Sequence, residues 1–263
     1  MPKDSNQAPR TAIGIDVGGT GIKGGIVDLD RGKLIGDRFR IPTPRPATPA
    51  AVAETVAEIV AELSARPEAP SPGIPVGVAF PVIIHNGIAR SAANVDASWI
   101  GTEVDALMTA RLGRPVQVVN DADAAGLAEA TYGAGRDVPG TVLMLTLGTG
   151  IGSALIHDGV LVPNVELGHL ELDGVDAETR ASAAARERED LSWTEYAQRL
   201  QRYLSHVEFL FSPNLFVVGG GISKLGHEFL PHLELATPVA TAKLRNKAGI
   251  VGAALRAWLP GID

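Results

Sequence analysis

The chain has 263 residues, a formal net charge of −7 and no cysteine. Its length allows one large or two modest domains, and its negative charge argues against general nucleic-acid binding. The lack of cysteine excludes disulfides and thiolate metal sites. The opening residues, MPKDSNQAPR, have no apolar core of a signal peptide, and no stretch is long and apolar enough to span a membrane. We therefore expect a cytoplasmic protein without membrane contact.

The first predicted elements are two β-branched strands within residues 13–27, IGIDVGGTGIKGGIV, joined by a glycine-rich turn. Glycine lets the backbone approach a ligand closely, and successive backbone N–H groups in such a turn suit phosphate oxygens. Asp16 beside a phosphate requires a cation or a water between them, and we expect Mg²⁺. An ordinary hairpin turn is the alternative. The candidate phosphate contacts are Asp16, Gly18, Gly19, Thr20, Gly21 and Lys23.

A third strand is predicted over residues 33–40, and a proline-rich connector follows over 42–49. Thr48 can cap a helix whose apolar residues recur at helical spacing as far as Leu63. The apolar run at residues 76–80 predicts a buried strand. Aromatic residues are scarce at 5%, while glycine and alanine are frequent, which fits α/β layers better than a β-sandwich.

A second helix is predicted from Thr102 to Leu112, ahead of a strand over residues 116–119. Asn120 and Asp121 follow that strand and lead into an alanine-rich helix. Ligands gather at the C-terminal ends of strands in open α/β sheets, so this placement favours a site. A helix cap is the alternative for this pair.

Residues 143–156, LMLTLGTGIGSALI, repeat the design of the first hairpin. Two such hairpins about half a chain apart suggest a duplicated domain that closes on a nucleotide from two sides. A third glycine run follows a predicted strand at residues 215–218; it could hold adenosine or form a plain strand-to-helix turn. The candidate donor contacts in these two places are Gly148, Thr149, Gly150, Gly219, Gly220 and Gly221.

The last third of the chain is mainly helical by pattern. Residues 176–190 are densely charged, which is typical of a solvated helix or a mobile loop. Ser192 and Glu195 form a capping box for a helix that runs to Phe211. A final helix is predicted over residues 248–258.

Polar side chains interrupt the apolar pattern in several places and suit a ligand rich in hydroxyls, such as a sugar, because each hydroxyl both donates and accepts. Asp121 is the best candidate for a general base that draws the proton from a primary hydroxyl. His169 alone is typical of a structural histidine, but its pairing with Glu166 favours function. A metal site through these two and Glu171 lacks an evident fourth ligand. The candidate sugar contacts are Asn94, Asn120, Asp121, Glu166, His169 and Glu171.

With these motifs the chain resembles the ROK family of sugar kinases from Ala12 to Leu255. IGIDVGGTGIKGGIV and LTLGTGIGSALI resemble the two phosphate loops of the family, VVGGGIS its adenosine-side loop, NDAD the segment of its catalytic aspartate, and ELGH its Glu-x-Gly-His sugar contact. Asn94 matches the asparagine of the Asn-x-x-x-x-Trp stretch, which ends here at Trp99. The resemblance implies that Asp121 is the base.

The same resemblance implies an actin-like ATPase (ribonuclease H-like) α/β fold of duplicated domains, with two lobes and a central cleft. We expect a smaller N-terminal lobe over residues 11–118, on which a C-terminal helix at 246–258 packs back, and a larger lobe over 119–245. A homodimer is expected on the same ground.

Many family members carry a cysteine-rich zinc motif after Glu-x-Gly-His, but residues 170–190 contain no cysteine here. We expect no structural zinc, and Glu171 is our candidate to replace the sugar contact that follows the motif. This short form, with VDLDRGKLIGDR and TPRPATP after the first loop, resembles actinobacterial members that use polyphosphate, some of which accept ATP and mannose. The resemblance thus implies Mg²⁺-dependent phosphoryl transfer from polyphosphate or ATP to the 6-hydroxyl of glucose, with mannose as a further acceptor.

Two other functions stay open. One is an ATP-only kinase of the family for another hexose, such as fructose or N-acetylmannosamine. The other is a sugar-binding regulator without kinase activity. The regulators carry a DNA-binding helix-turn-helix ahead of the kinase fold, whereas about ten residues precede the first strand here, so we expect no nucleic-acid partner.

Overall fold

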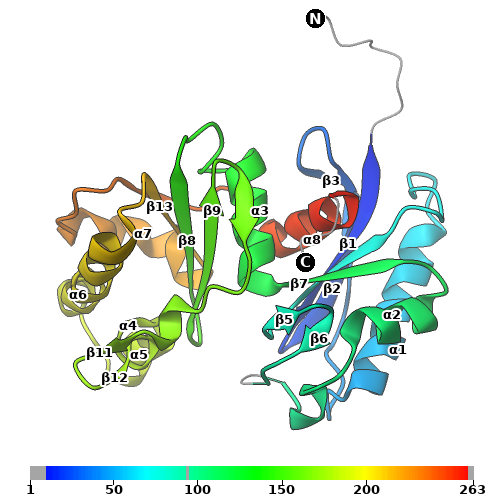
Figure 1. Ribbon diagram of the computed structural model, residues 1–263, viewed down its shortest axis with the longest axis horizontal. Coiled ribbons are helices and arrows are strands. Elements are labelled where there is room, and N and C mark those ends of the chain that lie inside the picture. Colours follow the sequence, from blue (N-terminus) through cyan, green and yellow to red (C-terminus); the bar gives the residue numbers. More distant parts are fainter. Residues whose placement is uncertain (1–9, 93–94, 260–263) are drawn as a thin grey trace, which may run out of the picture. The chain divides into compact units, whose positions relative to one another are not determined.

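The computed structural model of the protein describes residues 10–92 and 95–259. These residues form two compact units. The first contains the described residues up to Asp121 and those from Gly249 onward, and the second contains Ala122–Ala248. Each unit is built around its own five-stranded sheet (Figure 1).

The first unit combines strands and helices in alternation. Its elements are β1 (Thr11–Gly18), β2 (Gly21–Asp28), β3 (Lys33–Ile41), α1 (Pro49–Ser64), β4 (Val76–Phe80), β5 (Ile84–His85), β6 (Ile88–Ala89), α2 (Val104–Leu112), β7 (Val116–Asn120) and, from Gly249 onward, α8 (Ala248–Trp258). The sheet has the order β3-β2-β1-β4-β7. Its first three strands are antiparallel, whereas β1, β4 and β7 run parallel.

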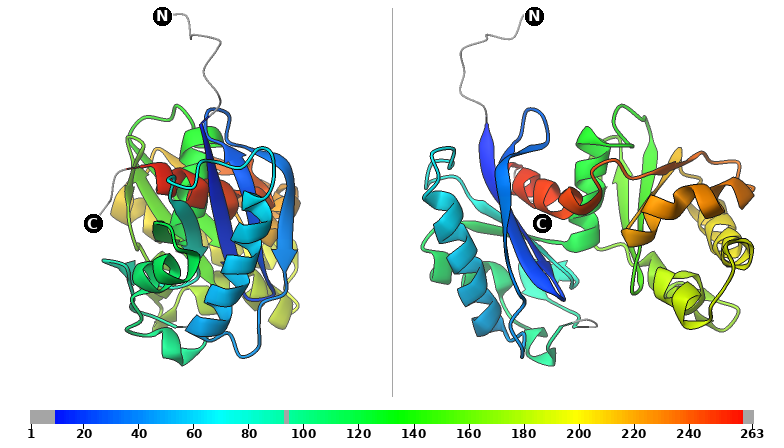
Figure 2. Two further views of the ribbon diagram at one scale, coloured as in Figure 1. Left: turned by 90° about the vertical axis from the view of Figure 1, so that its right-hand side faces the viewer. Right: turned by 180° about the vertical axis from the view of Figure 1, so that it is seen from behind.

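Helices α1 and α8 pack on opposite faces of this sheet (Figure 2). A Cβ atom at Gly24 would collide with Ile59 and Leu63 of α1, whereas one at Gly14 would collide with the backbone of α8 at Ile250. Because both faces are covered, β4 is apolar along its whole length, and each of its residues is buried. Glycine in β1 thus sets how closely α8 can approach the sheet.

The second unit follows the same plan. Its elements are, from Ala122 onward, α3 (Asp121–Tyr132), then β8 (Thr141–Leu147), β9 (Ile151–His157), β10 (Val160–Val162), β11 (Glu171–Leu172), β12 (Val175–Asp176), α4 (Glu178–Ala181), α5 (Ala183–Arg188), α6 (Trp193–Phe211), β13 (Leu215–Gly219), α7 (Gly226–Phe229) and β14 (Val239–Thr241). The sheet has the order β10-β9-β8-β13-β14, with β10, β9 and β8 antiparallel and β8, β13 and β14 parallel. This order and these directions repeat the first sheet strand by strand, which confirms the predicted duplication.

Local signals explain several helix ends. The predicted capping box of Ser192 and Glu195 begins α6, and the side chain of Thr48 caps α1. The charged stretch at residues 176–190 differs from the single solvated helix or mobile loop that its pattern suggested. It contains two short helices, α4 and α5, with Ser182 between them as the cap of α5. None of the helices in the described part of the chain combines the length and apolar character that a membrane crossing requires.

Candidate functional site

The first glycine hairpin places three charged side chains in one cross-strand row. Asp16 of β1 pairs with Lys23 of β2, which pairs with Arg40 of β3. The Lys23 Nζ atom lies 3.6 Å from Oδ2 of Asp16. The Arg40 guanidinium donates to the carbonyl oxygen of Thr20 in the turn, at 2.7 Å. Sequence reasoning missed Arg40, whose position opposite Lys23 depends on the register of β3.

Burial of the Asp16 carboxyl, whose side chain is 21% exposed, raises its pKa, and the nearby charges of Lys23 and Arg38 oppose that rise. Within residues 10–92 and 95–259 there is no group of three or more acidic or histidine side chains that could hold a metal ion. A single carboxylate still fits Mg²⁺, which proteins commonly hold through one or two carboxylates while substrate phosphates and water supply the other ligands.

A cavity of about 230 Å³ in the first unit lies at the tip of this hairpin and is lined by Gly18, Gly19 and the connector after β3. Trp99, which is fully buried, forms part of its wall. The indole nitrogen of Trp99 donates to the carbonyl oxygen of Ala47 at 2.8 Å, which ties the connector to this wall. The candidate sugar contact Asn94 lies outside the described residues.

Asn120 and Asp121 lie where β7 ends and α3 begins. Asn120 is buried, and its side-chain amide donates to the carbonyl oxygen of Val82 at 3.1 Å. Asp121 is the first residue of α3 and is exposed. Asn120 thus has a structural hydrogen bond, while the Asp121 carboxylate has the exposure that a base for an incoming hydroxyl requires.

The second glycine hairpin joins β8 to β9 and borders a cavity of about 360 Å³. Gly148 and Thr149 line this cavity together with Gly221 of the third glycine run. Gly220 has a φ of +82°, and a Cβ atom there would collide with the backbone of Leu147. The glycine run therefore passes directly against the end of β8, which gathers donor candidates from two distant segments of the second unit.

The other glycines of these two segments have packing contacts instead. A Cβ atom at Gly150 would collide with the carboxylate of Glu178, and one at Gly219 would collide with the side chain of Met144. The Glu178 Oε2 atom accepts a hydrogen bond of 3.0 Å from the backbone N–H of Ile151. The sequence pattern gave no sign of this carboxylate, which anchors α4 to the second hairpin.

The Glu-Leu-Gly-His segment packs beside the same hairpin. A Cβ atom at Gly168 would collide with the carbonyl oxygen of Ile151, so only glycine fits at the position before His169. The buried hydroxyl of Ser153 donates to the carbonyl of Val165 and accepts from the N–H of Leu167 at 2.8 Å. These two bonds fix the backbone on both sides of Glu166.

Carboxylates surround His169. Its Nδ1 atom lies 3.0 Å from Oδ2 of Asp176 and 4.0 Å from Oε1 of Glu178. The hydrogen bond with Asp176 is the main reason that the pKa of His169 is raised. Burial raises the pKa of Glu166, and the charge of His169 opposes that rise. Glu171 pairs across the β11–β12 hairpin with Asp176, so it belongs to the same group of acidic residues.

Asp123 is a further residue to which sequence reasoning assigned no role. It is 1% exposed on α3, and its Oδ2 atom accepts a hydrogen bond of 2.8 Å from the backbone N–H of Asn164. Asn164 has a φ of +58° and stands two residues before Glu166. Asp123 therefore holds the turn from which the Glu166 segment starts.

Comparisons with known proteins agree with this arrangement. A model of the ROK family matches residues 12–188. The chain is 52% identical to the polyphosphate glucokinase of Mycobacterium tuberculosis strain H37Rv over 94% of its own length and 91% of that protein. It is 30% identical to a glucokinase of Streptomyces coelicolor, over 92% and 96% of the two chains.

Solved structures give the same picture. The inorganic polyphosphate/ATP-glucomannokinase of Arthrobacter sp. strain KM superposes with a TM-score of 0.89 at 71% identity, over 94% of this chain and 98% of that one. A ROK family glucokinase of Streptomyces griseus, in complex with glucose and AMPPNP, has a TM-score of 0.76 at 25% identity, over 93% and 98%. The fold is that of the actin-like ATPases, as the sequence motifs implied.

Proposed function

The chain belongs to the ROK family, and on this premise we propose that it is a kinase that transfers a phosphoryl group from inorganic polyphosphate or ATP to the 6-hydroxyl of glucose. The observation that carries the proposal is the near full-length likeness to the polyphosphate/ATP-glucomannokinase. Mannose is proposed as a second acceptor on the same ground. We further propose that the enzyme is a homodimer, as the family resemblance suggests, and that it acts in the cytoplasm.

In this proposal the donor phosphates are bound by backbone N–H groups of the two glycine hairpins. Lys23 and Arg40 supply positive charge beside the first hairpin, which a polyanionic donor requires in a chain with a net charge of −7. Asp16 and the donor phosphates would hold Mg²⁺, which neutralises charge on the transferred group when it is bound.

Asp121 is proposed as the general base. It would accept the proton of the sugar hydroxyl while the hydroxyl oxygen forms a bond to the terminal phosphorus. The anhydride bond behind that phosphorus breaks, and ADP or a polyphosphate shortened by one unit leaves. Glu166 and His169, with Asn94, Asn120 and Glu171, are proposed to hold the sugar hydroxyls.

Initial-rate kinetics on the purified chain test the proposal, with glucose or mannose as acceptor and polyphosphate or ATP as donor. We expect turnover with glucose and both donors, and a loss in Asp121→Asn of about 10²- to 10⁴-fold in kcat, as expected when a general base is removed. Asp137→Asn, an exposed aspartate of the second unit, is the control.

Three results would contradict the proposal. Turnover with ATP alone and another hexose would favour the ATP-only kinase. Sugar binding without any phosphoryl transfer would favour a regulator. Near wild-type rates in Asp121→Asn would be compatible with the proposed reaction but would show that Asp121 is not its general base.

A further inference from the structure

The cavity beside the second glycine hairpin contains a stacked arginine. Arg186 of α5 lines this cavity together with Gly148, Thr149 and Gly221. Its guanidinium carbon lies 3.7 Å from the centroid of the Trp193 ring. A guanidinium stacked on an aromatic face is held in place, while its N–H groups point outward along its edge.

The Trp193 ring in turn packs against another aromatic side chain. The Trp193 ring stacks on Phe229, with ring centroids 5.9 Å apart and an interplanar angle of 19°. Phe229 is fully buried. Because the last ring of the stack cannot move freely in a close-packed interior, the guanidinium has a defined position in the cavity wall.

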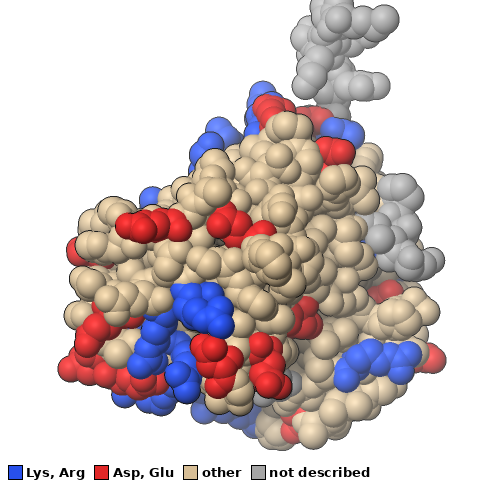
Figure 3. All heavy atoms as spheres, turned by 60° about the vertical axis from the view of Figure 1, so that its left-hand side comes forward, with Lys and Arg blue, Asp and Glu red and all other residues tan. Residues whose placement is uncertain are grey.

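No carboxylate neutralises Arg186. Among the residues that the structure describes, it forms no ion pair, and its Nε atom is buried without a hydrogen-bond partner. Elsewhere on the surface, basic and acidic atoms adjoin, as on the face shown in Figure 3. An arginine without a counter-ion in a cavity is ready to bind an anion.

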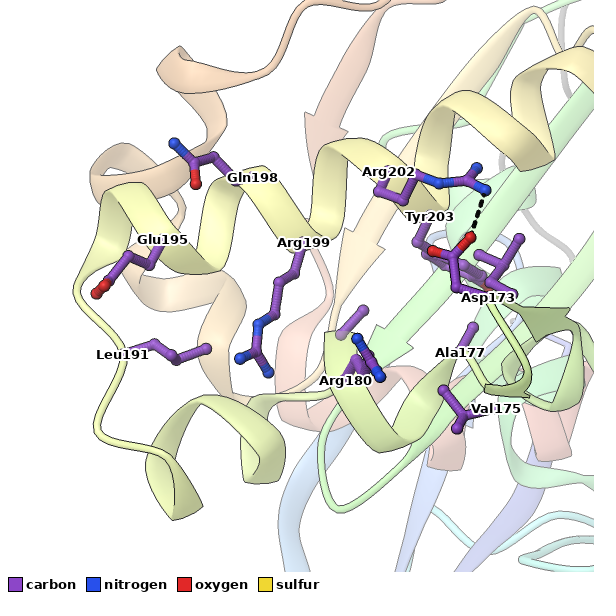
Figure 4. A pocket seen from close by; sticks show the side chains of 12 residues that line it. Asp173, Val175, Ala177, Arg180, Leu191, Glu195, Gln198, Arg199, Arg202 and Tyr203 are labelled. Atoms are coloured by element: carbon purple, nitrogen blue, oxygen red, sulfur yellow. Dashed lines mark hydrogen bonds and ion pairs between the residues drawn. The ribbon is translucent and has the colours of Figure 1, made fainter.

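A neighbouring cavity of about 380 Å³ shows the contrast (Figure 4). Arg180, Arg199 and Arg202 line it. Arg199 lies 2.6 Å from a carboxylate oxygen of Glu189 and Arg202 lies 3.0 Å from one of Asp173, whereas Arg180 has no ion pair with the residues that the structure describes. No residue of a glycine hairpin lines this cavity, so it is the weaker candidate for the phosphate donor.

Among the described residues that line the cavity of Arg186, Glu187 is the one acidic residue. It is exposed, and as the next residue on α5 it projects about 100° away from Arg186 around the helix axis. Its charge lowers the attraction of the cavity for a polyanion without contacting the guanidinium. Removal of the Glu187 charge should therefore strengthen polyphosphate binding, whereas removal of the Arg186 charge should weaken it.

We propose that Arg186 is a donor-specificity residue that binds the phosphate groups of polyphosphate beyond the one that is transferred. The inference rests on the proposed function, because the hairpin that holds the donor borders the same cavity. A polyphosphate carries a negative charge on every further unit, whereas the adenosine of ATP carries no charge. Loss of the Arg186 charge therefore weakens polyphosphate more than ATP.

Steady-state kinetics of Arg186→Gln with both donors test this assignment. We expect the KM for polyphosphate to rise about tenfold or more, which corresponds to one lost charge-assisted contact, while kcat and KM with ATP change little. The dependence of the polyphosphate KM on salt should become shallower, because one screened charge pair is gone. Arg186→Lys should recover part of the loss, and Glu187→Gln should lower the polyphosphate KM.

Arg202→Gln is the matched control, since it removes an arginine of the same unit that has a carboxylate partner. Equal rises of KM for both donors in Arg186→Gln, or no change in either, would overturn the assignment, as would a lysine variant no better than the glutamine one. Equilibrium binding of polyphosphate separates this inference from the proposed function. If the wild-type chain binds polyphosphate and does not transfer phosphate, the kinase fails, while weaker binding by Arg186→Gln still supports the Arg186 site.

Discussion

The Nδ1 atom of His169 lies 3.0 Å from Oδ2 of Asp176, and this hydrogen bond is the main reason that the pKa of the histidine is raised. Asp176→Asn removes the negative charge and keeps the size of the side chain. We expect the pKa of His169 to fall, which a titration of its ring protons by NMR would measure. The KM for the sugar should rise, because a neutral amide oxygen holds the ring less strongly than a carboxylate does.

The same pair makes a small pH-dependent contribution to stability. Because the folded-state pKa lies above the ordinary value of 6.5, this contribution is fully present below that pH and disappears as the pH rises through the raised pKa. Both side chains are about half exposed, so it amounts to less than about 1 kcal/mol. Asp173→Asn, in the turn of the same hairpin, is the control. A pKa of His169 that does not move in Asp176→Asn would show that another group raises it.

Ser153 supports the backbone around Glu166 through two hydrogen bonds of its buried hydroxyl, and this gives a second prediction. Ser153→Ala leaves the carbonyl of Val165 and the N–H of Leu167 without this partner. We expect a loss of about 1–3 kcal/mol in the free energy of unfolding, measured by urea denaturation, and a higher KM for the sugar with the donor KM unchanged.

Thr131→Ala is the control for the loss of a hydroxyl. The Thr131 hydroxyl also donates to a backbone carbonyl, that of Leu127, but it lies on the exposed side of α3. The effect of Thr131→Ala on stability should be smaller, and its sugar KM should equal that of the wild type. If Ser153→Ala behaves like Thr131→Ala, the serine does not hold the Glu166 segment.

Patterns local in sequence predicted much of the fold. The two glycine hairpins could be found because strand, turn and strand follow one another within fifteen residues, and the capping box at Ser192 because its partner stands three residues later. The strands β11, β12 and β14 have only two or three residues each, too few to show the alternation of a strand. They were therefore missed.

Local sequence patterns predicted only part of the site. Glu166 and His169 attract notice because they are polar residues in an apolar stretch. Asp176 becomes a partner of His169 only when the β11–β12 hairpin brings it back, and Arg40 joins Lys23 only through strand pairing. Glu178 accepts a hydrogen bond from the second hairpin. In the charged stretch after residue 176, the sequence alone does not distinguish it from acidic residues that face solvent.

Gly168 gives a third prediction, because a Cβ atom there would collide with the carbonyl oxygen of Ile151. Gly168→Ala should force the Glu-Leu-Gly-His turn away from β9 and lower the free energy of unfolding by about 1–3 kcal/mol, as overpacking of an interior commonly does. Calorimetry measures the stability, and the sugar KM reports the displacement. Gly73→Ala is the control, since nothing lies within 4 Å of its added methyl group. Equal melting temperatures for the two variants would contradict a steric role for Gly168.

Lys23 gives the last prediction, through its charge beside Asp16. Burial raises the pKa of the Asp16 carboxyl, and Lys23, whose Nζ atom lies 3.6 Å away, is the first of the groups that oppose this rise. Lys23→Met should therefore raise the pKa of Asp16 further. Since only the ionised carboxylate can hold Mg²⁺, the acid limb of the profile of kcat/KM against pH should move to higher pH.

The donor KM of Lys23→Met should also rise about tenfold, because a charge-assisted contact to phosphate is lost. The rise of the donor KM and the shift of the acid limb can be measured separately. An excess of donor restores kcat at high pH, whereas the position of the acid limb still follows the pKa of Asp16. Lys33→Met, at the far end of β3 and opposite Asp28, should move neither quantity. An acid limb that stays in place or moves to lower pH in Lys23→Met would mean that Asp16 is not the group whose ionisation limits the reaction.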